Sequence, residues 1–320
     1  MGNPDLKWQR TLNNNFGFTA AFLDSRFNLS FDFYSNTTND MLMSVNLPPS
    51  VGTTSMNVNF GKLNNKGLDL SLSAQIIRKK DWFWSMTLTG GHVMDQIRKI
   101  SQGLKNDIDN PNDSSKPKIL FVEGGSQYDI YAMRSAGIDP ATGKEIFIKK
   151  NGEYTFKYDE SERVAVGNTN PVLQGSWMNT VRYKGFSISI ATSYTFGSDY
   201  YNSTLKNKVE NIDLDYNVDR RVFTDRWKQP GDHTRFLGIG TSSSSYQYSE
   251  RFVEKRNELY ISSIQVMYDF APKAITRIGL RKLAIGFGLS DIAHISTVKF
   301  ERGTDYPYCR GINLIFRPTF

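Results

Sequence analysis

Side chains that could act in catalysis or hold a metal are few and scattered along the chain. The three histidines, His92, His233 and His294, belong to no H-E-x-x-H or paired Cys/His spacing, so the sequence predicts no zinc site. Cys309 is the only cysteine, which excludes an intrachain disulfide. The sequence also contains no G-x-S-x-G nucleophile motif. We therefore expect that the protein is not an enzyme.

Two segments bear a superficial likeness to ligand sites. Gly137 to Lys144 suggests a phosphate-binding loop, but five residues separate its glycines where four are required, and Glu145 follows where Ser or Thr is needed. An acidic cluster could hold calcium: Asp107, Asp109, Asn112 and Asp113. It lacks the glycine and the distant bidentate glutamate of an EF-hand loop, so a solvated loop is the simpler interpretation. The sequence predicts no cofactor, with calcium in an extracellular loop as the alternative.

Aromatic side chains in the expected loops are better candidates for ligand contact. Sugars have apolar C–H faces that stack on rings, while polar neighbours orient the hydroxyls. The candidates are Tyr128, Tyr131, Tyr200, Tyr201, Trp227, Tyr246 and Tyr248. Each could instead pack within a loop or at a membrane interface, and for any single ring we favour that structural role. A loop-folding motif is also expected, because Pro-Gly sets a turn, at Arg226, Trp227, Pro230, Gly231 and Asp232.

The composition is compatible with a soluble protein, apart from its aromatic content. The 320 residues carry a formal charge of +7, with a mean hydropathy of −0.46. The basic excess forms no stripe, so no nucleic-acid surface is predicted. No run of 18 apolar residues exists, which excludes a transmembrane helix. Aromatic residues nevertheless make up 13% of a chain that is only 39% hydrophobic, as aromatic girdles on an alternating surface would require.

Strict alternation of apolar and polar residues predicts strands with two different faces. In one segment Leu68, Leu70 and Leu72 alternate with aspartate and serine. We count nine such segments: about 12–22, 27–34, 68–76, 82–89, 173–183, 186–196, 264–270, 283–289 and 312–320. A soluble antiparallel sandwich alternates for the same reason. We expect Leu70, Ile188 and Ile285 to face lipid, and the inner face to include Ser71, Ser189 and Gly286.

The connections decide between the membrane protein and the sandwich. Short connections, at 23–26, 78–81, 184–185 and about 271–278, alternate with long ones, at about 35–66, 91–170, 197–257 and 291–309. Tight periplasmic turns with long extracellular loops are typical of outer-membrane barrels. Phe316 and the terminal Phe320 fit a last strand that ends at the periplasmic interface and guides membrane assembly. We predict an all-β, transmembrane antiparallel β-barrel in the bacterial outer membrane.

The predicted barrel is incomplete. Nine strands is an odd number, whereas single-chain bacterial barrels have an even one. An open sheet would also leave two edges with unsatisfied backbone groups in hydrocarbon. Met1 to Asp5 is polar, so no signal peptide is expected. We therefore expect residues 1–320 to be the C-terminal part of a barrel that an N-terminal chain completes.

Five segments, in this order along the chain, resemble motifs of the SusC/RagA-type TonB-dependent transporters of Bacteroidetes. They are the strand entry Asn3–Trp8, the strand start Asn65–Leu70, the loops Ala136–Lys144 and Asn168–Pro171, and the loop Arg226–Asp232. Two features depart from the family pattern: Cys309-Arg310-Gly311 before the last strand, and Pro318 inside it.

The resemblance implies a plugged, 22-stranded barrel of which this chain supplies about the last nine strands. It implies a SusD-like surface lipoprotein as lid, energy supplied through TonB by way of the missing N-terminal part, and import of oligosaccharides or, less often, peptides. The alternative is a passive porin or a surface-adhesin barrel half.

Overall fold

Nine strands form one antiparallel sheet in the computed structural model, which describes residues 4–46, 52, 55–100, 121–212, 215, 217–240, 247–275, 279–300 and 309–320. In sheet order they are β1 (Arg10–Phe22), β2 (Phe27–Asn46), β3 (Ser55–Arg78), β4 (Trp82–Ile100), β10 (Leu173–Tyr183), β11 (Phe186–Tyr201), β12 (Val253–Asp269), β13 (Lys282–Ser296) and β14 (Gly311–Thr319). All nine predicted strands are present, and within the sheet they follow one another in the order in which they occur along the chain. No helix among the described residues is long and apolar enough to cross a membrane.

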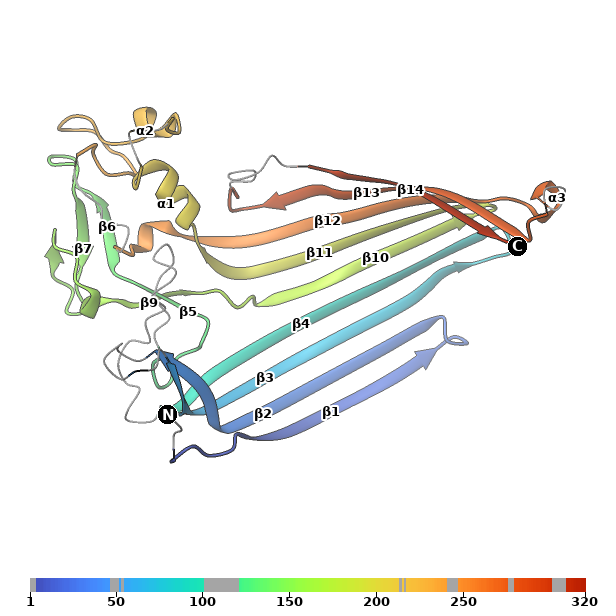
Figure 1. Cartoon of the computed structure of the whole chain (residues 1–320), viewed down its shortest axis with the longest axis horizontal. Coiled ribbons are helices and arrows are strands. Elements are labelled where there is room, and N and C mark those ends of the chain that lie inside the picture. Colours follow the sequence, from blue (N-terminus) through green and yellow to red (C-terminus); the bar gives the residue numbers. More distant parts are fainter. Residues whose placement is uncertain are drawn as a thin grey trace.

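Connection length is sorted by end, as predicted. The short turns, together with α3 (Pro272–Ile275) and the C-terminus, lie at one end of the sheet, and the long connections lie at the other (Figure 1). The first turn is tight, with φ near +50° to +60° at Leu23, Asp24 and Ser25. The Arg26 guanidinium secures it by donating to the carbonyl oxygen of Ile76 at 2.8 Å.

The strands are longer than the alternation predicted. Residues 35–66 were expected to form a loop, but β2 continues to Asn46 and β3 begins at Ser55. The segment Asn65–Leu70 therefore lies within β3 and does not start it. Bulges bend the extended part, and Gly61 at one of them has φ +152°, where an added Cβ would lie 1.9 Å from the Lys99 carbonyl oxygen. Only glycine fits at this position.

Short elements fill the long connections. Between β4 and β10 lie β5 (Asp129–Ala132), β6 (Arg134–Ile138), β7 (Glu145–Ile148), β8 (Tyr154–Thr155), a 3-10 turn (Glu160–Glu162) and β9 (Val164–Asn168). Between β11 and β12 lie α1 (Ser203–Val209), α2 (Arg221–Thr224) and a second 3-10 turn (Glu250–Phe252). Within the described residues, these connections therefore contain regular secondary structure.

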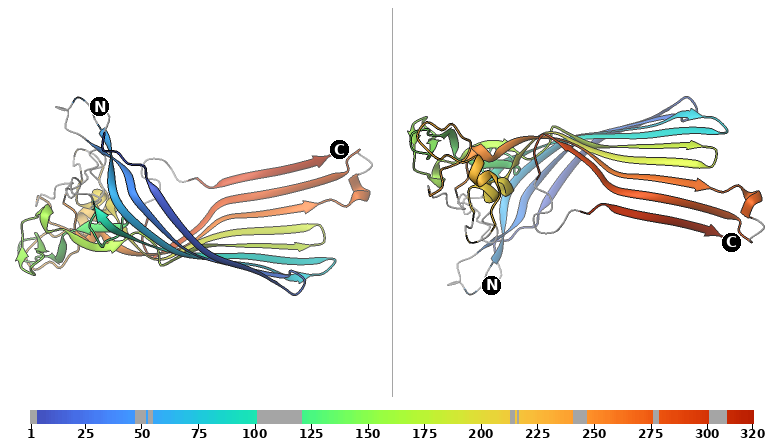
Figure 2. Two further views of the ribbon diagram at one scale, coloured as in Figure 1. Left: turned by 90° about the horizontal axis from the view of Figure 1, so that it is seen from below. Right: turned by 90° about the horizontal axis from the view of Figure 1, so that it is seen from above.

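The sheet is twisted and arched (Figure 2). Within the described chain β1 pairs only with β2, and β14 pairs only with β13, so both are edge strands. A curved antiparallel sheet with two open edges is the shape of a section of barrel wall.

Candidate functional site

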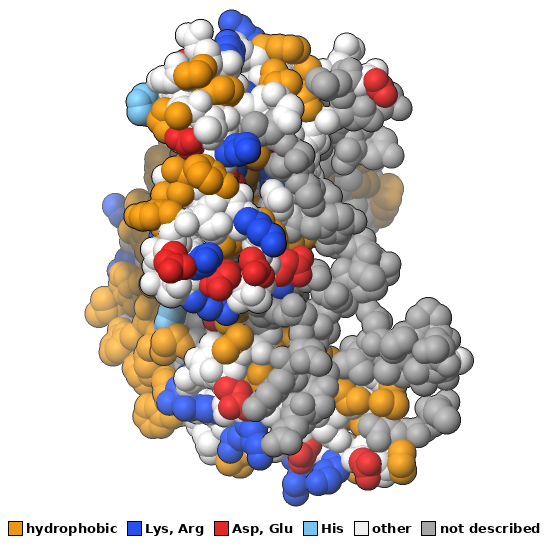
Figure 3. All heavy atoms as spheres, turned by 90° about the vertical axis from the view of Figure 1, so that its left-hand side faces the viewer, with side chains coloured by type: hydrophobic (Ala, Val, Ile, Leu, Met, Phe, Trp, Pro, Cys, Tyr) orange, Lys and Arg blue, Asp and Glu red, His pale blue; other side chains and the backbone are white. Residues whose placement is uncertain are grey.

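The outward face of the sheet is apolar. Strand register places apolar side chains of five neighbouring strands in one row: Val181, Ile188, Val266, Phe287 and Leu314. Leu70, Ile188 and Ile285, the residues predicted to face lipid, are 41%, 42% and 43% exposed. Hydrophobic side chains gather along one side of the molecule when it is viewed from the long-loop end (Figure 3). Such a surface suits contact with hydrocarbon.

The opposite face carries a ladder of hydroxyl groups. Ser71 is the register partner of Thr89, and the Thr89 hydroxyl lies 2.8 Å from that of Ser176. Thr180 and Ser189 form another hydroxyl pair at 3.2 Å. These side chains bond to one another and remain compatible with water, so this face can line an aqueous lumen.

An open hollow of about 320 Å³ interrupts the inner face around two carboxylates. Asp32 and Asp69 are register partners on β2 and β3. Gly17 and Gly91 make room for them, because an added Cβ would lie 2.2 Å from Asp32 Oδ1 or 2.5 Å from Asp69 Oδ1. Within the described residues no group of three or more His, Cys, Asp or Glu side chains could hold a metal. The acidic cluster for which calcium was the alternative, residues 107–113, lies outside the described residues.

The two longest connections pack together into what we call the loop subdomain, the described residues of 121–172 and 201–252. Its hydrophobic core consists of Ile130, Ala132, Tyr201, Leu205, Val209, Phe236, Tyr248 and Phe252. Backbone bonds join the two connections: the Met133 amide donates to the Tyr248 carbonyl at 3.0 Å, and the Glu250 amide donates to the Met133 carbonyl at 3.1 Å. The subdomain therefore has a core of its own at the long-loop end.

A buried ionic network lies beside this core. The Arg251 guanidinium contacts Glu145 at 2.7 Å and Glu210 at 2.9 Å, and all three side chains are less than a tenth exposed. Lys206 is also buried and donates to the Gln247 carbonyl oxygen. Burial lowers the pKa of the Lys206 ammonium to about 8, although the Glu210 and Glu145 carboxylates oppose this shift. The network fixes the two connections relative to each other.

Two of the family-like motifs pack against each other. The Trp227 indole N–H donates to the Pro140 carbonyl oxygen at 2.9 Å, and its ring lies against Gly143, where an added Cβ would be 2.5 Å away. The Gly231 amide donates to the same Pro140 oxygen. Arg226 is buried and donates to the carbonyl oxygens of Leu237, Val209 and Gly238. Asp232 accepts the amides of Lys228 and Gln229, which closes the Pro-Gly turn.

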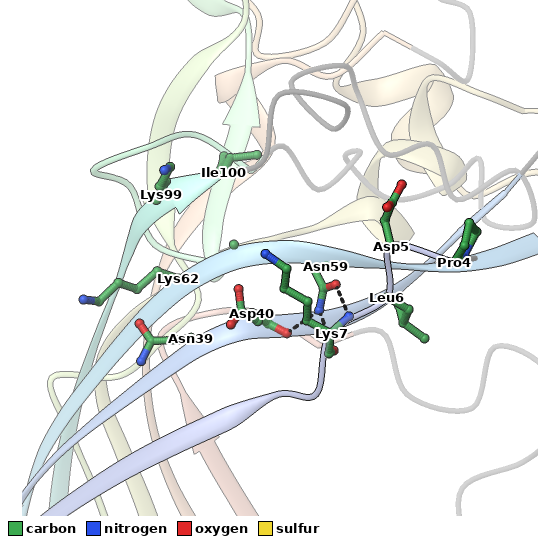
Figure 4. A pocket seen from close by; sticks show the side chains of 11 residues that line it. Pro4, Asp5, Leu6, Lys7, Asn39, Asp40, Asn59, Lys62, Lys99 and Ile100 are labelled. Carbon is green, nitrogen blue, oxygen red and sulfur yellow. Dashed lines mark hydrogen bonds between the residues drawn. The ribbon is translucent and has the colours of Figure 1, made fainter. Parts of the chain in front are cut away.

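The N-terminal segment crosses the long-loop ends of β2 and β3 (Figure 4). The Lys7 amide donates to Asn59 Oδ1 at 2.8 Å, while the Asn59 amide group donates to the carbonyl oxygens of Lys7 and Asp40. Beside it lies an open hollow of about 980 Å³ whose charged lining is Asp5, Lys7, Asp40, Lys62 and Lys99. Three lysines and two aspartates therefore line the hollow, and two of the lysines, Lys62 and Lys99, are register partners on β3 and β4. The sequence offered only the strand-entry motif as a signal of this site.

The predicted ligand-contacting rings lie in different environments. Tyr131, Tyr201 and Tyr248 are 7%, 8% and 2% exposed, so they pack in the loop subdomain, and their burial is evidence against ligand contact. Trp227 is half-buried against the Pro140 loop. Tyr128 is 43% exposed, and the partly exposed Tyr200 contacts the ring of Phe300 at 5.1 Å. Tyr246 lies outside the described residues. Ligand contact stays a prediction for the whole set, and among the described rings exposure favours Tyr128 and Tyr200.

The C-terminal aromatic residues lie on the edge strand. Phe316 is 64% exposed on the outward face, next to Ile285 in register, and Phe320 is 81% exposed at the short-turn end. Pro318 falls within β14, where an edge strand tolerates the loss of a backbone donor. A role for these residues in membrane assembly stays a prediction.

Comparison with known proteins supplies an independent line of evidence. A family profile described as "TonB dependent receptor-like, beta-barrel" matches residues 1–128. "TonB-dependent receptor P39" of Formosa agariphila is 25% identical over 337 residues, which are 91% of this chain and 32% of that protein. "TonB-dependent receptor SusC" of Bacteroides thetaiotaomicron is 26% identical over 282 residues, covering 84% of this chain and 27% of that protein.

The fold is similar to that of a solved transporter. A structure described as "Structure of the RagAB peptide transporter" superposes with a TM-score of 0.77 at 23% identity, over 93% of this chain and 33% of the other. The chain therefore spans about a third of the length of the proteins that it matches.

Proposed function

We propose that this chain is the C-terminal part of the outer-membrane β-barrel of a TonB-dependent receptor of the SusC/RagA type, and that it supplies the wall and the mouth of an importer for oligosaccharides. In this proposal the remaining strands and a plug lie outside the chain, TonB supplies the energy through them, and a SusD-like lipoprotein covers the mouth. No enzymatic step is involved. The observation that carries the proposal is a two-faced wall that continues directly into a loop subdomain with its own core.

The loop subdomain favours a gated importer over a passive barrel. A lid protein needs a surface of fixed shape on which to close. The core around Tyr201 and Phe252 and the ion pairs of Arg251 hold the two longest connections in one arrangement. A passive porin or an adhesin scaffold has less need of a preorganised surface at this end.

Oligosaccharides are the proposed substrates because one exposed and one partly exposed ring lie where the wall meets the loop subdomain. Tyr128 precedes β5, and Tyr200 lies near the end of β11. Hydroxyl groups line the inner face below, and they can exchange hydrogen bonds with a sugar as readily as with water. Peptides are the alternative, because the RagAB structures of similar fold are described as a peptide transporter.

Uptake by the complete transporter tests the proposal. Tyr128→Ala and Tyr200→Ala would be compared with Tyr154→Ala, which removes a ring that is 71% exposed on β8. Growth would be measured on candidate oligosaccharides and on peptides, with and without functional TonB, and the lipoprotein would be sought by capture of the tagged barrel. We expect TonB-dependent growth on a glycan that the first two variants impair and the third does not.

The opposing outcomes are distinct. TonB-dependent growth on peptides alone would assign the same machinery to peptides. Normal growth of every variant on every substrate, with no lipoprotein recovered beside the wild-type barrel, would identify a passive scaffold.

A further inference from the structure

The short-turn end of the sheet carries a compact cluster of lysines. The turn between β3 and β4 lies beside the turn between β10 and β11, because the Lys184 amide donates to the Asp81 carbonyl oxygen at 2.9 Å. This contact brings Lys79, Lys80 and Lys184, which we call the turn lysines, to the same edge, and all three side chains are exposed. Asp81 is the one acidic residue in these two turns.

Neighbouring arginines add to the positive potential. Arg78 and Arg182 are both register partners of Phe83, and the Arg182 guanidinium lies 4.5 Å from the centre of that ring. Among the ion pairs of the described residues, none involves the turn lysines or these two arginines. These five cations outnumber the two nearby carboxylates, those of Asp81 and of Asp269, whose amide donates to the Gly185 carbonyl oxygen. The cations therefore repel one another, and an external anion would relieve that repulsion.

An aromatic belt borders the turn lysines on the outward face. Trp82 and Tyr183 have ring centres 4.7 Å apart, and Phe186 and Tyr268 have theirs 4.6 Å apart. Trp82, Tyr183 and Phe186 are 44%, 40% and 55% exposed. The Lys184 ammonium lies 5.3 Å from the centre of the Tyr183 ring, which joins the cluster to the belt. Amphipathic rings at the ends of membrane strands mark the level of the lipid head groups.

We propose that the turn lysines bind the head groups of anionic phospholipids in the leaflet that meets the short-turn end. An anionic phospholipid has the two parts that this surface requires: a phosphate for the lysines and acyl chains for the adjoining apolar face. A soluble polyanion or an acidic protein would use only the charges, whereas a phospholipid also contacts Trp82 and Phe186 beside them. The proposal rests on the outer-membrane location of the barrel and is independent of the imported substrate.

The test uses the complete transporter in vesicles of equal parts phosphatidylglycerol and phosphatidylcholine. The variant Lys79→Gln/Lys80→Gln/Lys184→Gln keeps most of each side chain and removes its charge. The matched control is Lys7→Gln/Lys62→Gln/Lys99→Gln, which removes three exposed lysines from the long-loop end. After gentle extraction, the lipids retained by the protein would be quantified by mass spectrometry, and thermal denaturation would be followed with added lipid or glycerol 3-phosphate.

We expect the wild type and the control to retain phosphatidylglycerol in excess, and the turn variant to lose about fivefold in preference for each lysine removed. Phosphatidylglycerol should raise the denaturation temperature of the wild type but not of the turn variant. Unchanged enrichment in the turn variant would overturn the proposal. Equal stabilisation by glycerol 3-phosphate would also overturn it, because the site would then recognise a free phosphate and not a membrane. Substrate uptake reports separately on the proposed function.

Discussion

Replacing Ile190 on β11 with arginine tests the assignment of the two faces. Ile190 alternates with Ser189 and lies four residues from Phe186, which belongs to the aromatic belt. At about 3.3 Å per residue this is roughly 13 Å along the strand. At a tilt of about 40° it is roughly 10 Å from the edge of an apolar band about 25 Å tall. Ile190 therefore lies near the midplane, where an outward arginine costs about 2–4 kcal/mol.

Two neighbouring positions supply the internal comparison. Ile188 is outward but nearer the belt, so arginine there should cost about 1–2 kcal/mol, between the midplane and interface values. Ser189 points into the lumen beside Thr180, and arginine there should cost less than about 1 kcal/mol because it enters water. Gly286 is unsuitable as an inner control, since an added Cβ would lie 2.7 Å from Met267 Cγ.

The free energy of unfolding of the complete barrel in lipid vesicles would be measured by denaturant titration for each variant. The expected order of destabilisation is Ile190→Arg, then Ile188→Arg, then Ser189→Arg. Equal costs at Ile190 and Ser189 would refute the assignment of faces. A larger cost at Ile188 than at Ile190 would refute the position of the midplane.

Three further predictions concern the ends of the sheet and the loop subdomain. A cysteine at the exposed Asn207 should react with an impermeant reagent on intact cells, whereas one at Lys79 should not, and the reverse would invert the orientation. Arg251→Met removes the guanidinium that contacts both the Glu145 and the Glu210 carboxylates, so it should destabilise the loop subdomain by about 3–5 kcal/mol, seen as faster amide exchange. The pKa of Lys206 in the folded protein is about 8, below its ordinary 10.5, so the unfolded subdomain binds more protons than the folded one between these two pH values. The stability of the subdomain against local opening should therefore rise from pH 8 to 10. Lys206→Met should flatten that rise.

The alternation of residue types predicted every strand of the sheet but not the full length of each. Within the membrane, the lipid-facing side of each strand must be apolar and the lumen-facing side polar, so apolar and polar residues alternate along the sequence. Residues 36–38 are polar at every position, yet they continue the β2–β3 ladder, and the Asn64 side chain donates to Thr37 Oγ1 at 2.9 Å. Beyond the lipid both faces meet water, so backbone pairing persists after the alternating pattern ends.

The site was less predictable because its contacts are distant in sequence. Pro230-Gly231 correctly indicated a turn, but nothing local shows that Trp227 lies against Gly143, which is more than 80 residues earlier. The absence of a side chain at Gly143 and at Gly238 provides space for the indole. Similarly, Tyr201 and Tyr248 were candidates for ligand contact because both lie in expected loops, and only the packed subdomain shows that they are buried.

The ionic network explains how long connections can present a defined surface at the mouth. A buried ion pair adds little net stability, since desolvation offsets most of the attraction, but an unpaired buried charge is strongly unfavourable. Any shift of the β4–β10 connection relative to the β11–β12 connection would separate Glu145 from Arg251 and incur that penalty. Apolar contacts such as those of Phe252 and Tyr201 tolerate sliding more readily, because they have no preferred direction. The hydrophobic core therefore holds the two connections together, while the charges select one arrangement of them, and a lid protein closing over the barrel would meet the same surface in each transport cycle.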